Sequence, residues 1–281
     1  MSWLSQLLER NSSDPRVRLE LGQELLDHLA VSRLPSDTKI INEFCDVVFQ
    51  WLASSNFKVS LLSLELLQAS LCVSGDVLAP YLHERVTSLV ERLGDAKPQV
   101  REAAASLLAD LANVQHSSHE AVLERISPGF HHKQYLVRIG VMNVFVRLLD
   151  ESREELEVQT NRLIPTLCKL MSDPNVEVRE TATNTLAHVM LVFGEEISNG
   201  VRNRRLIPDS KSEKVPRCVT GSHEVRPPSA WRQEMAVKLS MSGSLRTPDN
   251  VRPRRLVAVD PGGALIFHGP ALLDDLDSPF V

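Results

Sequence analysis

Apolar residues in the first 200 positions recur at the spacing of amphipathic helices, and short polar stretches separate these helices in pairs. Leu21, Leu25 and Leu29, for example, lie on one face of one such helix. The pattern predicts helices at residues 2–10, 16–30, 37–53, 57–73, 76–93, 97–113, 119–131, 134–150, 154–171 and 175–193. Gly194 is expected to end the last of them. The sequence therefore predicts an all-α chain of helix pairs over this region.

The helix pairs follow one another with a nearly constant period. One valine opens the second helix of each pair, at Val17, Val59, Val100, Val137 and Val178, so successive valines lie 42, 41, 37 and 41 residues apart. A turn-forming segment precedes each valine. A period near 40 with two amphipathic helices per unit is typical of HEAT or armadillo repeats. We therefore expect an α-solenoid of about five complete repeats followed by a partial sixth.

The segment from Leu93 to Ala104 illustrates the expected turn inside a repeat. Gly94 is expected to stop the first helix by adopting a positive φ. Asp95 can cap the free N–H groups of the next helix, and Pro98 suits a first turn that needs no N–H donor. Val100 should then point into the core, while Arg101 points elsewhere.

Charge and proline divide the chain near residue 200. Residues 1–200 hold 18 Lys and Arg against 27 Asp and Glu, whereas residues 201–281 hold 13 against 9 together with 9 of the 16 prolines. We therefore expect a HEAT-repeat domain at 1–200, a partial sixth repeat at 201–214, and a disordered basic tail rich in Pro, Ser and Arg at 215–281.

Several classes of protein are not expected. The polar, amphipathic start does not read as a signal peptide, and no continuous apolar run has the 18 or more residues of a membrane span. Dispersed cysteines, three of them on predicted helices, indicate buried free thiols in a reducing compartment, so we expect a soluble cytoplasmic protein. The histidines at 116, 119, 131 and 132 are expected to lie in surface loops without binding metal. No phosphate loop or nucleophile elbow is present. We expect no enzymatic activity and no cofactor.

In a solenoid the turns inside the repeats line up along one edge. We define the turn edge as residues 13–18, 54–59, 95–101, 131–138 and 173–179. These windows hold eight basic and four acidic residues, whereas the other residues up to 200 are strongly acidic. A basic strip on an acidic body fits an acidic protein partner. The alternative is structural: each Asp caps a helix and each Arg after a valine bridges the repeats. Lys58, Lys97 and Lys133 are the better functional candidates.

The turns resemble those of a known family. Residues 51–59 (WLASSNFKV) are similar to the second-repeat turn of the CLASP microtubule-associated proteins, and residues 93–102 (LGDAKPQVRE) to the third. Residues 130–138 (FHHKQYLVR) resemble the fourth turn, and residues 170–182 (LMSDPNVEVRETA) the fifth. The resemblance covers about residues 1–200 and corresponds to the family's N-terminal TOG array.

This resemblance implies an α-solenoid whose turn edge contacts the tubulin heterodimer or the microtubule lattice. It implies a role in microtubule stabilisation and cell division, at the cytoskeleton, the mitotic spindle and the kinetochore. By position, the implied tubulin-binding residues are Asn56, Phe57, Lys58, Asp95, Lys97, Arg101, His132, Lys133, Arg138, Asp173, Asn175 and Arg179.

The sequence departs from the family pattern at the first turn. Tubulin-binding TOG arrays often carry a tryptophan there, but residues 11–16 hold none, and Trp51 ends a later helix where it can simply belong to the core. A general HEAT scaffold that binds another protein through its concave helix face therefore remains the alternative. Nucleic acid fits poorly, because the acidic body would repel phosphates. We expect a monomer with no nucleic-acid or membrane partner.

Overall fold

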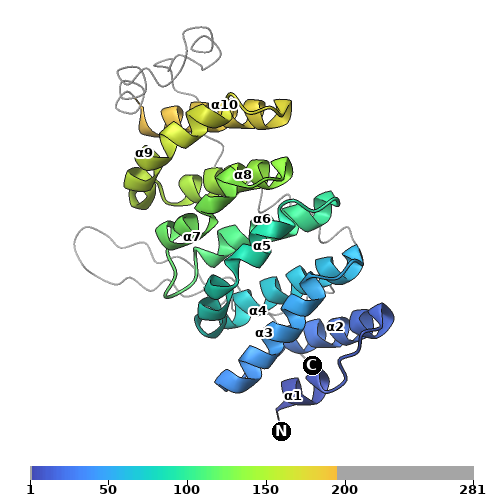
Figure 1. The fold of residues 1–281 in the computed structure, drawn as a ribbon. Helices are drawn as coiled ribbons and strands as arrows, with labels where there is room; N and C mark the ends of the chain where they lie inside the picture. Colours follow the sequence, from blue (N-terminus) through green and yellow to red (C-terminus); the bar gives the residue numbers. More distant parts are fainter. Residues whose placement is uncertain (1, 195–281) are drawn as a thin grey trace, which may run out of the picture. The chain divides into compact units, whose positions relative to one another are not determined.

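The computed structural model describes residues 2–194, and every regular element in this part of the chain is helical (Figure 1). The elements are α1 (Trp3–Leu8), α2 (Pro15–Leu29), α3 (Thr38–Leu52), α4 (Phe57–Glu84), α5 (Val86–Arg92), α6 (Pro98–Leu111), α7 (His119–Ile126), the 3₁₀ helix η1 (Ser127–His131), α8 (Tyr135–Glu151), α9 (Arg153–Leu170) and α10 (Val176–Phe193). The expected partial sixth repeat and the tail lie outside the described residues.

The helices stack in chain order as two layers. The second helices of successive repeats contact one another in the order α2, α4, α6, α8 and α10, while α1 packs on α3, α5 on α7 and α7 on α9. Figure 1 shows this succession from α1 to α10. The prediction of an α-solenoid is therefore confirmed over the described residues.

One continuous hydrophobic core runs between the two layers. Four of the five valines that marked the repeats, Val59, Val100, Val137 and Val178, are fully buried, whereas Val17 in the first repeat is only half-buried. Leucine, valine and alanine supply most of the remaining core, so the helices approach closely with few aromatic side chains between them. The repeat period in the sequence thus reflects a repeated core position.

The third repeat departs from the expected helix boundaries. Helix α4 continues past residue 73 with a kink at Ser74, whose φ of −144° and ψ of 40° are not helical. The Ser74 hydroxyl accepts a hydrogen bond from the Leu34 N–H at 2.9 Å, which stabilises the kink. The single helix expected at 76–93 is broken at Arg85, where the guanidinium binds Asp46 at 2.7 Å.

Helix α4 also has the length and mean hydropathy of a membrane-spanning helix, with 28 residues and an 18-residue window of mean hydropathy 1.4. No stretch of this length and hydropathy was expected from the sequence. Half of that window is buried inside the fold, and α4 packs on α2, α3 and α6. Helix contacts within the solenoid therefore account for its apolar character.

Gly94 and Gly194 end helices in different ways. Gly194 has the expected positive φ of 71° and caps α10. The expectation of a positive φ at Gly94 is wrong. A Cβ at Gly94 would lie 2.5 Å from Gln134 Oε1 and 2.7 Å from Val137 Cγ2, so glycine is needed there because the fourth repeat packs directly on its backbone.

The three cysteines in the described residues are free thiols. Cys45 is buried, and burial raises the pKa of its thiol to about 12. Cys168 is half-buried, and burial raises the pKa of its thiol to about 11. Cys72, on α4, is exposed. The expectation of burial is therefore wrong for this residue.

Candidate protein-binding edge

In every repeat the side chain that follows the core valine holds its own turn closed. It donates to the carbonyl oxygen six residues earlier, at 2.6–3.0 Å, in the pairs Arg18–Ser12, Ser60–Ser54, Arg101–Asp95, Arg138–His132 and Arg179–Asp173. In the second repeat the Ser60 hydroxyl performs this role in place of a guanidinium. Three predicted site residues, Arg101, Arg138 and Arg179, therefore have a local structural function.

A second repeated contact shapes the turns. A side-chain acceptor receives the backbone N–H two residues later, in the pairs Asp14–Arg16, Asn56–Lys58, Asp95–Lys97, His132–Gln134 and Asp173–Asn175, at 2.8–3.2 Å. The Asn175 side chain in turn accepts from the Val178 N–H at 3.2 Å. Five further predicted site residues, namely Asn56, Asp95, His132, Asp173 and Asn175, thus satisfy free N–H groups at helix starts.

Neighbouring turns are also joined to one another. Trp51 Nε1 donates to Asn11 Oδ1 at 3.0 Å, which links the first two turns, and the Lys97 ammonium lies 5.1 Å from the centre of the Phe57 ring, which links the second and third. Gln134 Nε2 donates to the Gly94 carbonyl at 2.5 Å. Each contact fixes one turn against the next, so the edge is held as a row.

The last two turns are joined by an ion pair. Arg138 Nη2 lies 3.0 Å from Asp173 Oδ1, and their side chains are only 13% and 9% exposed. Such a pair stabilises a fold only when both partners are present, because a lone buried charge is costly. Arg138 therefore serves both its own turn and the following repeat.

The remaining predicted residues project from this row. Lys58, Lys97 and Lys133 are exposed at successive turns, and Phe57 is half-buried beneath Lys97. Among the described residues, no contact occupies the side-chain amine of Lys58 or Lys133. Their positive charges are thus available to a partner, which agrees with the distinction that the sequence analysis drew between lysines and arginines.

The structure adds two exposed apolar residues that were not among the predicted site residues. Tyr135 and Val176 are 37% and 53% exposed at the first positions of α8 and α10. Phe57 occupies the same position in α4. The missed signal was that the residue two before each core valine is apolar in all five repeats (Pro15, Phe57, Pro98, Tyr135 and Val176). The turn edge therefore combines exposed lysines with apolar side chains.

Trp51 does not belong to this exposed set. Its side chain is fully buried, and its only polar atom is satisfied by Asn11. The interpretation of Trp51 as a core residue is confirmed. The first turn therefore contributes Arg16, which is exposed, and no aromatic side chain.

One histidine differs from its expected surface position. His119 is 9% exposed at the start of α7, and its Nδ1 lies 3.0 Å from Glu155 Oε2, while Nε2 lies 3.6 Å from Glu151. Burial would raise the pKa of Glu155, but hydrogen bonds from the Glu120 N–H, Ser152 and His119 lower it below its usual value. The acidic start of α9 thus binds α7 through His119.

Comparisons with known proteins place these features in a family context. The family model described as EF3 N-terminal HEAT repeat matches residues 54–186. CLASP-1 from Caenorhabditis briggsae is 40% identical over 213 residues, which cover 75% of this chain and 16% of the CLASP-1 chain. This chain therefore spans about one sixth of the length of that relative.

Solved structures agree in fold. The N-terminal domain of MAST/Orbit has a TM-score of 0.67 and 27% identity, covering 74% of this chain and 94% of that domain. Crescerin, which uses a TOG domain array to regulate microtubules in the primary cilium, gives a TM-score of 0.63 at 20% identity, covering 74% of this chain and 88% of that one. The homologues of this chain are CLASP proteins, and its described residues form a HEAT-repeat array of the TOG type.

Proposed function

We propose that this chain is a non-enzymatic module that binds tubulin, as the heterodimer or within the microtubule lattice, through its turn edge. The observation that carries this proposal is the row of exposed cations at Lys58, Lys97 and Lys133 on turns that are fixed to one another. The homology to CLASP proteins supports tubulin as the partner. A microtubule-associated location and a stabilising effect on microtubules follow as parts of the same proposal.

The charges explain how such a surface would select its partner. The chain is acidic overall, with a net charge of −5, so a partner with an acidic surface is repelled by most of it and attracted to the turn edge. Complementary charge of this kind orients the encounter, while buried apolar contacts supply most of the affinity. Phe57, Tyr135 and Val176 provide apolar contact area beside the lysines.

The turns are well prepared for binding because their backbone is already ordered. Each turn is clamped onto its own carbonyls and linked to the next turn. The backbone therefore loses little conformational entropy when a partner docks. We therefore infer that Asn56, Asp95, Arg101, His132, Arg138, Asp173, Asn175 and Arg179 act mainly by holding the edge in shape, while Phe57, Lys58, Lys97 and Lys133 make the contacts.

The first test replaces three contact residues in the full chain, as Phe57→Ala/Lys97→Ala/Lys133→Ala. One apolar anchor and two exposed cations contribute together about 2–3 kcal/mol, so the Kd for free tubulin should rise about 30-fold to 150-fold. Wild-type binding should also weaken as salt rises, and the variant should lose most of that salt dependence. Fluorescence binding at two salt concentrations, with microtubule co-sedimentation, measures both effects.

A control variant tests whether tubulin binding depends on where the cations lie or only on the net charge of the chain. Lys39→Ala/Arg162→Ala removes two cations that lie off the turn edge, so it changes the net charge by the same amount. It should bind tubulin like the wild type. Wild-type protein that binds neither tubulin nor microtubules would refute the proposal and favour the alternative, a HEAT scaffold whose partner docks on the helix face.

A further inference from the structure

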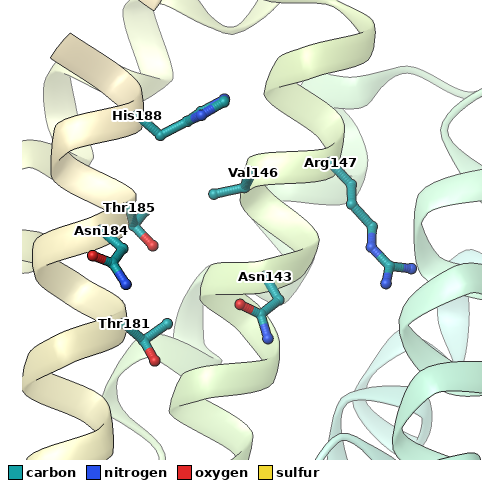
Figure 2. Close-up of a pocket in the computed structure, with 7 residues that line it drawn as sticks. All are labelled: Asn143, Val146, Arg147, Thr181, Asn184, Thr185 and His188. Atoms are coloured by element: carbon teal, nitrogen blue, oxygen red, sulfur yellow. The ribbon is translucent and has the colours of Figure 1, made fainter. Parts of the chain in front are cut away.

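A groove with both polar and apolar lining lies on the helix face, away from the turn edge. It runs between α8 and α10, has a volume of about 470 Å³, and is shown in Figure 2. Since the tubulin proposal uses only the turns, the groove needs a separate explanation.

Two asparagines face the groove from equivalent places in consecutive repeats. Asn143 lies six residues after the core Val137, and Asn184 lies six residues after the core Val178. Both side chains are exposed, and neither amide has a hydrogen-bond partner among residues 2–194. At the same position the first three repeats carry Gln23, Glu65 and Ser106, so the paired amides are a feature of the last two described repeats alone.

The two basic side chains at the groove each contact a carboxylate of the fold. Arg147 points from α8 away from α10, and its Nη2 lies 2.6 Å from Glu102 Oε1 on α6. His188 points from α10 toward α8, and its Nε2 lies 2.6 Å from Asp150 Oδ1. A phosphate or carboxylate ligand needs cations without a competing carboxylate. The groove therefore favours a neutral ligand.

The other residues that line the groove further restrict the class of ligand that it can bind. The Thr181 hydroxyl is used within its own helix, where it donates to the Glu177 carbonyl at 2.8 Å. Val146 projects from α8 into the groove and offers a small apolar surface. Thr185 also lines the groove, but its side chain is buried. The exposed polar groups of the lining are thus the two amides, each of which can donate and accept a hydrogen bond as a peptide unit does.

We propose that this groove binds an extended peptide segment of a partner protein, with Asn143 and Asn184 hydrogen-bonded to its backbone. Packed helix axes lie about 8–10 Å apart, and an extended chain rises about 3.3 Å per residue. The two amides would therefore hold peptide units about three residues apart. Small uncharged side chains between them would fit over Val146.

The test uses the full chain and a phage-displayed library of random dodecapeptides as the probe. Enriched peptides, made synthetically, should bind Asn143→Ala/Asn184→Ala on the order of tenfold or more weakly than wild type, since two hydrogen bonds are lost. Gln23→Ala/Ser106→Ala removes polar groups at the same position of other repeats and should leave the Kd unchanged. Alanine favours helices, so the variants should remain folded, as circular dichroism can verify.

A scan of backbone N-methylation along the enriched peptide gives a second measurement. Binding should be lost at two positions about three residues apart. The proposal is overturned if no peptide is enriched, if the double variant binds with unchanged Kd, or if every N-methylated peptide still binds. Tubulin binding of Asn143→Ala/Asn184→Ala should equal that of wild type, so this proposal and the proposed function fail independently.

Discussion

Replacing Arg138 with alanine should lower the free energy of unfolding by about 3–5 kcal/mol, because it leaves the buried Asp173 carboxylate without its partner. The change also removes the donor to the His132 and Lys133 carbonyls, so the fourth turn loses its clamp. Both effects loosen the junction between the last two described repeats. Urea unfolding followed by circular dichroism at 222 nm, a general helix signal, measures the change.

Arg101→Ala is the matched control for this prediction. Arg101 clamps the Asp95 and Ala96 carbonyls of its own turn in the same way, but its guanidinium forms no ion pair with a carboxylate among the described residues. The Arg101→Ala variant should lower the free energy of unfolding by about 1–2 kcal/mol, the usual effect of lost hydrogen bonds. Equal losses for the two variants would show that the ion pair with Asp173 adds nothing to stability.

Replacing Trp51 with alanine should cost a similar amount, about 3–5 kcal/mol, because it empties a large site in the core of the second repeat. Trp51→Phe keeps most of the apolar volume and removes only the hydrogen bond to Asn11, so it should cost about 1 kcal/mol. The same unfolding measurement compares the two variants.

The Trp51 variants also separate a core role from a binding role. Under a core role, Trp51→Phe keeps the turns in place and should bind tubulin with nearly the wild-type Kd. A large loss of tubulin affinity in a stably folded Trp51→Phe variant would mean that the indole takes part in the interface, contrary to its burial.

The repeat architecture could be predicted because its signals are local. The valine at each repeat start and the turn before it recur within the sequence, and the core position of Val100, Val137 and Val178 follows directly. The contact at Asp95 is equally local, since its carboxylate accepts from the Lys97 N–H two residues later, although it does not cap the first turn of α6 as expected. Such features need no knowledge of the neighbouring repeat.

The errors concern contacts between repeats. Position 94 must be glycine because Gln134 and Val137, about forty residues away, leave no room for a Cβ there. No local pattern in the sequence indicates that contact. His119 is buried by the acidic start of α9, which lies more than thirty residues further along the chain. Long-range packing of this kind decides whether a polar residue belongs to the surface or to the core.

The candidate site was predictable in part. The charge pattern located the strip, and the repeat spacing already set the arginines apart from the lysines. Which carbonyl oxygens the guanidinium groups bind could be learned only from the structure. Tyr135 and Val176 were not predicted as site residues, because the apolar position two residues before each valine shows the repeat but not that the side chain there is exposed. The homology to CLASP proteins does not replace this geometry.

The most direct test of the central claim is zero-length carbodiimide cross-linking of the full chain to tubulin, with the linked residues identified by mass spectrometry. The reagent joins an amine only to a carboxylate in contact with it. We predict cross-links from Lys58, Lys97 and Lys133 to tubulin carboxylates, and none from Lys39, which lies off the turn edge. Cross-links at Lys39 with none at the three turn lysines would contradict the account.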